Sequence, residues 1–140
     1  MKSAPGVGST FTLTLPLEYT KSAAPALPAA RPGPGPTQAQ SLAWSTDGGM
    51  TWRRHAGNPV LCRQSADFRD PKVFRHPTGW VMVAVEANHR QIVLYRSDDL
   101  TAWEHLSTFG PLGVTEGVWE CPDLFELPVD GGPQTAWVLV

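Results

Sequence analysis

Two acidic side chains, Asp70 and Glu120, have the chemistry of a pair that acts on a glycosidic bond. Asp70 belongs to the run Phe68 to Pro71, and Glu120 belongs to the run Trp119 to Pro122. The two runs occupy equivalent places in successive copies of a sequence repeat, so we expect their acidic side chains to converge on one cavity. In glycoside hydrolysis one carboxylic acid protonates the leaving oxygen, while a second carboxylate attacks or stabilises the sugar cation.

The neighbours of these acids indicate how each would work. Arg69 should hold Asp70 as an ionised acceptor for sugar hydroxyls. Trp119 and Cys121 could reduce the hydration of Glu120, and Trp119 either lines a sugar subsite or packs in the core. An isolated Arg-Asp-Pro triplet is also typical of a turn with an ion pair. Its place one repeat before Glu120 favours the functional interpretation.

The repeat itself rests on three signals that keep one order and nearly one period. The tryptophans Trp52 and Trp103 are 51 residues apart. The matched segments are Ser45–Trp52 with Ser97–Trp103, Pro71–Phe74 with Pro122–Phe125, and Trp80–Val83 with Trp137–Val140. A period near 50 residues built from short strands and turns is typical of a β-propeller, in which each repeat is one four-stranded blade.

Within the complete repeat the sequence predicts four strands joined by turns, near residues 72–75, 80–86, 91–97 and 103–106. Asp47 and Asp99 lie in turn sequences and should cap backbone amides, and Trp52 and Trp103 should anchor neighbouring blades. The innermost strand of a blade lines the central channel, and both acids precede such a strand. The predicted fold class is therefore all-β, a partial propeller of about two blades. A complete propeller has roughly four to eight, so we expect a fragment of a longer protein.

Composition divides the chain into three predicted parts. Residues 1–20 contain an isolated strand-like tail, with alternating polar and apolar side chains from Ser9 to Leu15. Residues 21–40 contain five Pro and six Ala and should form a disordered linker, because little burial would compensate for the entropy of ordering. Residues 41–140 should form the partial propeller.

Charge and cysteine content exclude several classes of partner. The formal net charge of −2 and the pI near 6.0 provide no broad attraction for nucleic acid or for anionic membranes. The sequence shows no signal peptide and no membrane-spanning run, and it does not identify a cellular compartment. It contains no feature that predicts an oligomeric state. We interpret Cys62 and Cys121 as free thiols, and we expect no metal and no cofactor.

The run Phe68 to Phe74, the Ser97 to Trp103 segment and especially Gly117 to Phe125 resemble glycoside hydrolase family 32, the β-fructofuranosidases. The resemblance spans about residues 41–140. It implies a five-bladed propeller and a retaining mechanism that releases fructose from levan, inulin or sucrose, with levanases and exo-inulinases as the nearer branch. It also implies that Glu120 is the general acid/base, and that Asp70 with Arg69 stabilises the transition state and grips the fructosyl unit.

One departure from the family matters. Its nucleophile is an aspartate in an Asn-Asp-Pro-Asn-Gly type motif, and residues 1–140 contain no such motif. Because the covalent intermediate needs that aspartate, we expect this chain to be inactive alone. The alternative is a non-catalytic carbohydrate-binding propeller segment, which would not need Glu120.

The N-terminal tail has a resemblance of its own. Residues 6–13 are similar to the closing strand of sensor histidine kinase ATPase domains but lack that family's nucleotide-binding motifs. The tail is therefore interpreted as the remnant of a fusion or of a wrong gene start. A third hypothesis, a sensor kinase fused to a sugar-recognition domain, predicts ATP binding by a longer gene product.

Overall fold

The computed structural model describes residues 2–4, 8–10, 37–114 and 116–140, and it contains strands, turns and one short 3₁₀ helix. Two compact units are present, one within residues 26–122 and one that combines residues 123–140 with parts of 1–25. The helix is η1 (Ala87–His89). The strands are β1 (Lys2–Ala4), β2 (Gly8–Thr10), β3 (Gln38–Gln40), β4 (Ala43–Trp44), β5 (Arg53–Arg54), β6 (Leu61–Ser65), β7 (Phe68–His76), β8 (Gly79–Glu86), β9 (Gln91–Ser97), β10 (Glu104–Phe109), β11 (Leu124–Pro128) and β12 (Thr135–Leu139).

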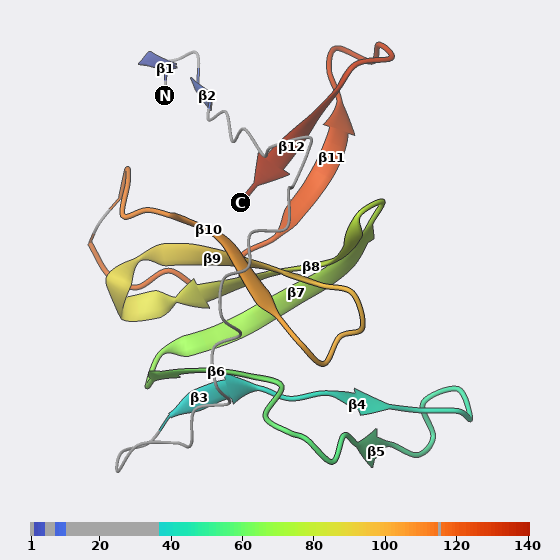
Figure 1. The fold of residues 1–140 in the computed structure, drawn as a ribbon. Coiled ribbons are helices and arrows are strands. Elements are labelled where there is room, and N and C mark those ends of the chain that lie inside the picture. Colours follow the sequence, from blue (N-terminus) through green and yellow to red (C-terminus); the bar gives the residue numbers. More distant parts are fainter. Residues whose placement is uncertain (1, 5–7, 11–36, 115) are drawn as a thin grey trace. The chain divides into compact units, whose positions relative to one another are not determined.

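The larger unit contains one complete propeller blade. Strands β7, β8, β9 and β10 form a four-stranded antiparallel sheet in that order, each paired with the next along the chain (Figure 1). This meander confirms the blade predicted from the repeat. The main difference is at its start, where β7 begins at Phe68 rather than near Lys72, because Phe68 and Arg69 already pair with β8.

The core of this unit follows from the apolar composition of the two central strands. Val83, Val85, Val93 and Leu94 have no exposed surface. These side chains project from both faces of the sheet, since successive residues of a strand point to opposite sides. The consecutive apolar runs of β8 and β9 therefore mark strands that are covered on both faces, as the sequence predicts.

Ahead of the complete blade, the same unit holds the two outer strands of another. β3 pairs with β6, and β4 pairs with β5, so the chain runs out and back as an interrupted hairpin beside β7 (Figure 1). The side-chain amide of Gln40 donates to the carbonyl oxygen of Phe68 at 3.0 Å and fastens this hairpin to the blade. Of the predicted linker, only residues 37–40 are described, and Gln38–Gln40 form β3 there.

The repeated turns have repeated hydrogen bonds. The Asp47 carboxylate accepts the backbone N–H of Thr51, and the Asp99 carboxylate accepts the backbone N–H groups of Thr101 and Ala102. Both aspartates thus cap backbone amides, as expected.

The two tryptophans of these turns differ in packing. The indole N–H groups of Trp52 and Trp103 donate to the carbonyl oxygens three residues earlier, at 3.0 and 3.1 Å. Trp103 packs against the core, but Trp52 is 64% exposed. Trp103 therefore fits the expected anchoring role, and for Trp52, whose ring lies on the surface of this unit, that role stays a prediction.

The smaller unit contains the β11–β12 hairpin, which corresponds in the repeat to β7–β8. It also contains the β1–β2 pair, so residues 9–10 of the predicted N-terminal strand are extended, while residues 11–15 lie outside the described part. The described strands thus make one complete blade, β7–β10, and two half-blades, β3–β6 and β11–β12. This agrees with the prediction of about two blades.

Candidate active site

Asp70 is placed by an irregularity in β7. The pairing of β7 with β8 shifts register between Arg69 and Lys72, and Asp70 has a φ of 54°. Aspartate adopts this left-handed conformation more readily than most residues, and the following Pro71 has no N–H to donate to a ladder. Such a bulge re-aims a side chain. Asp70 therefore leaves the regular alternation of its strand.

The same backbone conformation recurs one repeat later. The sequence repeat matches Asp70 with Cys121 and Arg69 with Glu120, and Cys121, which also precedes a proline, has a φ of 48°. These equivalent residues touch each other. The Cys121 N–H donates to Asp70 Oδ2 at 3.0 Å, and Arg69 Nη2 donates to Glu120 Oε1 at 3.0 Å.

These contacts locate the cluster within the fold. The blades of a propeller are arranged around a central channel, so equivalent residues of neighbouring blades approach one another most closely beside that channel. A residue that touches its own repeat equivalent must therefore lie near the axis. The geometry brings Asp70 and Glu120 together through Arg69 and Cys121, and their place at a shared cavity mouth stays a prediction.

Arg69 is the centre of the electrostatics. Its guanidinium lies 3.0 Å from Glu120 Oε1, 3.1 Å from Asp67 Oδ1 and 3.9 Å from Asp70 Oδ2. The hydrogen bond to Glu120, followed by the one to Asp67, raises the pKa of Arg69. The expected close pairing of Arg69 with Asp70 is thus a weaker contact, because the bulge turns Asp70 towards the Cys121 N–H.

Exposure distinguishes the two acids. The side chain of Glu120 is 56% exposed, whereas that of Asp70 is 29% exposed. The expected shielding of Glu120 by Trp119 and Cys121 is absent. The ring of Trp119 stacks on Phe109 with centroids 6.3 Å apart and donates its N–H to the Val114 carbonyl oxygen.

The side chains of Trp119 and Cys121 thus contact residues other than Glu120. Trp119 and Phe109 are both half-buried and lie outside the core cluster, so the core and the substrate-contact interpretations of Trp119 both stay predictions. The Cys121 sulfur lies 3.8 Å from Asp70 Oδ2, and both cysteines are free thiols. The arrangement offers one solvent-facing carboxylate that can exchange a proton, and one hydrogen-bonded carboxylate that can accept sugar hydroxyls.

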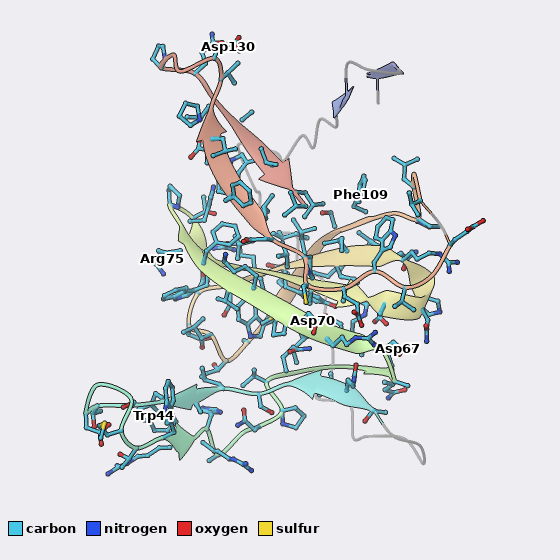
Figure 2. The ribbon with its side chains drawn as sticks, turned by 180° about the vertical axis from the view of Figure 1, so that it is seen from behind. Trp44, Asp67, Asp70, Arg75, Phe109 and Asp130 are labelled. Atoms are coloured by element: carbon cyan, nitrogen blue, oxygen red, sulfur yellow. The ribbon has the colours of Figure 1, made fainter. Side chains whose placement is uncertain are left out.

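Sequence reasoning missed Asp67 and Asn88. Asp67 shares the guanidinium of Arg69 with Glu120, and Asn88 donates to the other oxygen of Asp67. Figure 2 shows Asp67 and Asp70 near the start of β7. The spacing Asp67-x-Arg69 was an available signal, because residues two apart on an extended chain point to the same side.

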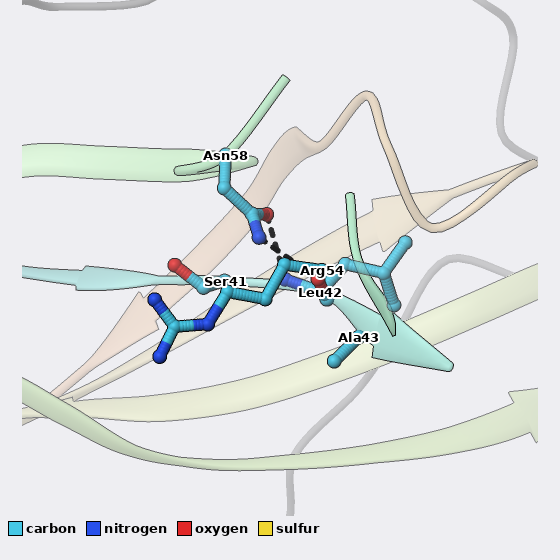
Figure 3. Close-up of a pocket in the computed structure, with 5 residues that line it drawn as sticks. All are labelled: Ser41, Leu42, Ala43, Arg54 and Asn58. Atoms are coloured by element: carbon cyan, nitrogen blue, oxygen red, sulfur yellow. Dashed lines mark hydrogen bonds between the residues drawn. The ribbon is translucent and has the colours of Figure 1, made fainter. Parts of the chain in front are cut away.

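A half-open hollow of about 320 Å³ lies elsewhere in the same unit, lined by Ser41, Leu42, Ala43, Arg54 and Asn58 (Figure 3). The Asn58 amide accepts from the N–H of Leu42 and donates to its carbonyl oxygen, both at 2.8 Å. Asn58 therefore holds the backbone of this hairpin, and none of the lining residues belongs to the candidate active site.

Among the described residues, no group of three or more His, Cys, Asp or Glu side chains could hold a metal ion. Asp67, Asp70 and Glu120 surround a guanidinium instead. No helix within that described part has the length and apolarity needed to cross a bilayer.

Comparison with known proteins agrees with the motif resemblance. The model of the glycosyl hydrolases family 32 N-terminal domain matches residues 14–140. The levanase of Bacillus subtilis is 50% identical over 107 residues, which cover 73% of this chain and 16% of the levanase. The invertase of Schizosaccharomyces pombe is 39% identical over 107 residues, covering 75% of this chain and 18% of the invertase.

Solved structures give the same result. The exo-inulinase of Aspergillus awamori matches with a TM-score of 0.70 and 42% identity, over 74% of this chain and 22% of the inulinase. The fructofuranosidase of Schwanniomyces occidentalis in complex with fructose matches with a TM-score of 0.71 and 36% identity, over 74% of this chain and 21% of that protein. These matches confirm the predicted fold class, an all-β partial five-bladed propeller. The chain spans about a fifth of the length of these relatives.

Proposed function

Because the chain belongs to glycoside hydrolase family 32, we propose that it supplies part of the active site of an enzyme that cleaves β-fructosidic bonds in levan, inulin or sucrose. Relatives named levanase, exo-inulinase and invertase support these substrates. The observation that carries the proposal is the pair of contacts that joins Asp70 and Arg69 to Cys121 and Glu120 across two repeats.

Each residue has a proposed role that follows from its environment. Glu120 is the general acid/base by its match to the family motif, and its carboxylate faces solvent, where a leaving oxygen can reach it. Asp70 and Arg69 bind the fructosyl hydroxyls and stabilise the charge that develops on the sugar ring. Trp119 is a substrate contact at the edge of the site.

The proposed double displacement also needs a nucleophile. Residues 1–140 contain no Asn-Asp-Pro-Asn-Gly type motif, so the attacking aspartate must be supplied by polypeptide outside them. We therefore propose that the 140-residue chain alone is inactive. We also propose the division predicted from composition, with a tail over residues 1–20, a linker over 21–40 and the catalytic propeller part over 41–140, except that Gln38–Gln40 belong to the propeller part because they form β3.

One observation favours a second candidate, a carbohydrate-binding segment without catalysis. Glu120 is ion-paired with Arg69, and a carboxylate in that state is an acceptor rather than a proton donor. This candidate predicts sugar binding that does not depend on the acidity of residue 120.

Activity in a completed propeller separates the two candidates. The chain is extended at both ends with the missing segments of the levanase relative, and fructose release from levan, inulin and sucrose is measured. We expect hydrolysis, and we expect Glu120→Gln to lower its rate by about 10²- to 10⁴-fold, the usual contribution of a general acid. Glu116→Gln, an exposed neighbour, is the matched control. Equal rates for Glu120→Gln and Glu116→Gln would exclude the catalytic role of Glu120.

A further inference from the structure

The guanidinium of Arg69 is held from two sides. Nη2 donates to Glu120 Oε1 at 3.0 Å, and Nη1 donates to Asp67 Oδ1 at 3.1 Å. The Asp67 side chain is 30% exposed, so this pair is partly shielded from water. Arginine presents its N–H donors in a rigid planar fork, so partners at both edges fix the orientation of the guanidinium. Asp67 contacts Nη1 of the guanidinium, the group that Glu120 does not contact.

Asp67 is itself fixed by three contacts. Asn88 Nδ2 donates to Oδ2, the oxygen that does not contact Arg69. The Asp67 backbone N–H donates to Ser65 Oγ at 3.1 Å, and its carbonyl oxygen accepts the N–H of Ala87 at 3.1 Å. Both carboxylate oxygens and both backbone polar groups of Asp67 therefore have partners.

These contacts lead back to the buried part of the blade. Ser65 Oγ also donates to Glu86 Oε2 at 2.6 Å, and the Glu86 side chain is only 2% exposed. Ala87, which is fully buried, accepts the backbone N–H of Trp119 at 3.3 Å. The short helix η1 thus fastens the segment that carries Asp67 and the segment that carries Glu120 to the same residue.

We propose that Asp67, steadied by Asn88, is a positioning residue that fixes the Arg69 guanidinium between Glu120 and Asp70. Without Asp67, Nη1 loses its charged partner and the guanidinium can rotate away from the orientation that presents Nε to Asp70. The consequence for catalysis rests on the proposed function, but the orientation of Arg69 does not.

Arginine side-chain NMR on the 140-residue chain tests this directly. The Nε–Hε and Nη resonances of Arg69 are assigned by their loss in Arg69→Lys, and the exchange between its two Nη groups is measured. We expect slow exchange in the parent chain. In Asp67→Asn we expect exchange about tenfold faster, the factor that corresponds to one charge-assisted hydrogen bond. The Glu120 carboxyl carbon resonance should shift in the same variant, a signature that loss of packing elsewhere would not produce.

Asp98→Asn is the matched control. Asp98 also pairs with an arginine two residues away, Arg96, at 2.7 Å, but its side chain is 73% exposed. This variant should leave the Arg69 exchange unchanged. Unaltered Arg69 exchange in folded Asp67→Asn, or an equal effect of Asp98→Asn, would overturn the proposal.

A second variant decides the matter if Asp67→Asn does not fold. Asn88→Ala removes only the amide donor to Asp67, and it should accelerate the Arg69 exchange by a smaller factor in the same direction. Unchanged exchange in Asn88→Ala would then overturn the proposal. Because no sugar is present, failure here is distinguishable from failure of the proposed function, which shows as missing fructose release.

Discussion

Replacing Arg63 by methionine should destabilise the blade strongly, because it leaves a buried carboxylate without its counter-ion. Arg63 Nε donates to Glu86 Oε1 at 2.6 Å, and the Glu86 side chain is 2% exposed. Arg63 also donates to the hydroxyl of buried Tyr95 and lies 5.7 Å from the ring centroid of Phe68. The substitution therefore removes a charge partner, a hydrogen-bond partner and a cation–π contact.

The magnitude follows from the burial of the group left behind. Breaking a buried ion pair from one side costs roughly 3–5 kcal/mol. Arg63 is 31% exposed, so water can enter once its side chain is shortened, and we expect a loss of about 3 kcal/mol in the free energy of unfolding. With a slope of roughly 1–3 kcal/mol per molar urea, the urea midpoint falls by about 1–3 M.

Urea unfolding followed by circular dichroism measures this change, and a double-mutant cycle isolates the pair. Glu86→Leu combined with Arg63→Met replaces both charges with apolar groups and should recover much of the loss. A single-variant loss below about 0.5 kcal/mol, typical of an exposed pair, would refute the reasoning. So would a double variant whose loss equals the sum of the two singles.

Two further predictions concern the backbone near the site and the acid limit of stability. Gly110→Ala should displace the Trp119 indole N–H resonance and destabilise the fold by about 1–3 kcal/mol, because the added Cβ would lie 2.8 Å from the Trp119 ring and would overlap the carbonyl oxygen of Arg90. Gly113→Ala, also at positive φ but with open space around its Cβ, should leave that resonance in place. Hydrogen bonds from the Ala102 N–H and from Thr101 hold the pKa of Asp99 well below its ordinary value. The contribution of Asp99 to the stability of the fold is therefore complete above the unfolded-state pKa of about 3.9 and is lost as the pH falls towards the folded pKa. Asp99→Asn should flatten the fall in melting temperature at acid pH. Asp98→Asn should not.

The sequence predicted the fold well because its signals are local and repeated. Runs such as Trp80 to Glu86 are apolar on successive positions and short, which indicates strands covered on both faces. The repeat then supplied the spatial step, since equivalent positions before Pro71 and Pro122 had to lie near one axis. The repeat alone therefore predicts that Asp70 and Glu120 lie close together.

The parts that sequence reasoning missed depend on backbone irregularity and on side-chain direction. No local pattern predicted the bulge that turns Asp70 towards the Cys121 N–H and leaves Arg69 to Glu120 and Asp67. Trp119 and Glu120 are adjacent along the chain, yet their side chains go to different partners. Their adjacent positions in the sequence therefore do not make Trp119 shield Glu120 from water.

The central claim is that acids from two successive repeats act on one sugar, and carboxyl carbon NMR of the 140-residue chain during a fructose titration tests it most directly. We predict that the side-chain carboxyl resonances of Asp70 and Glu120 shift together along one binding curve, while that of Asp98 stays in place. Shifts of equal size at Asp98, separate curves for the two acids, or no response from either acid would contradict a shared site.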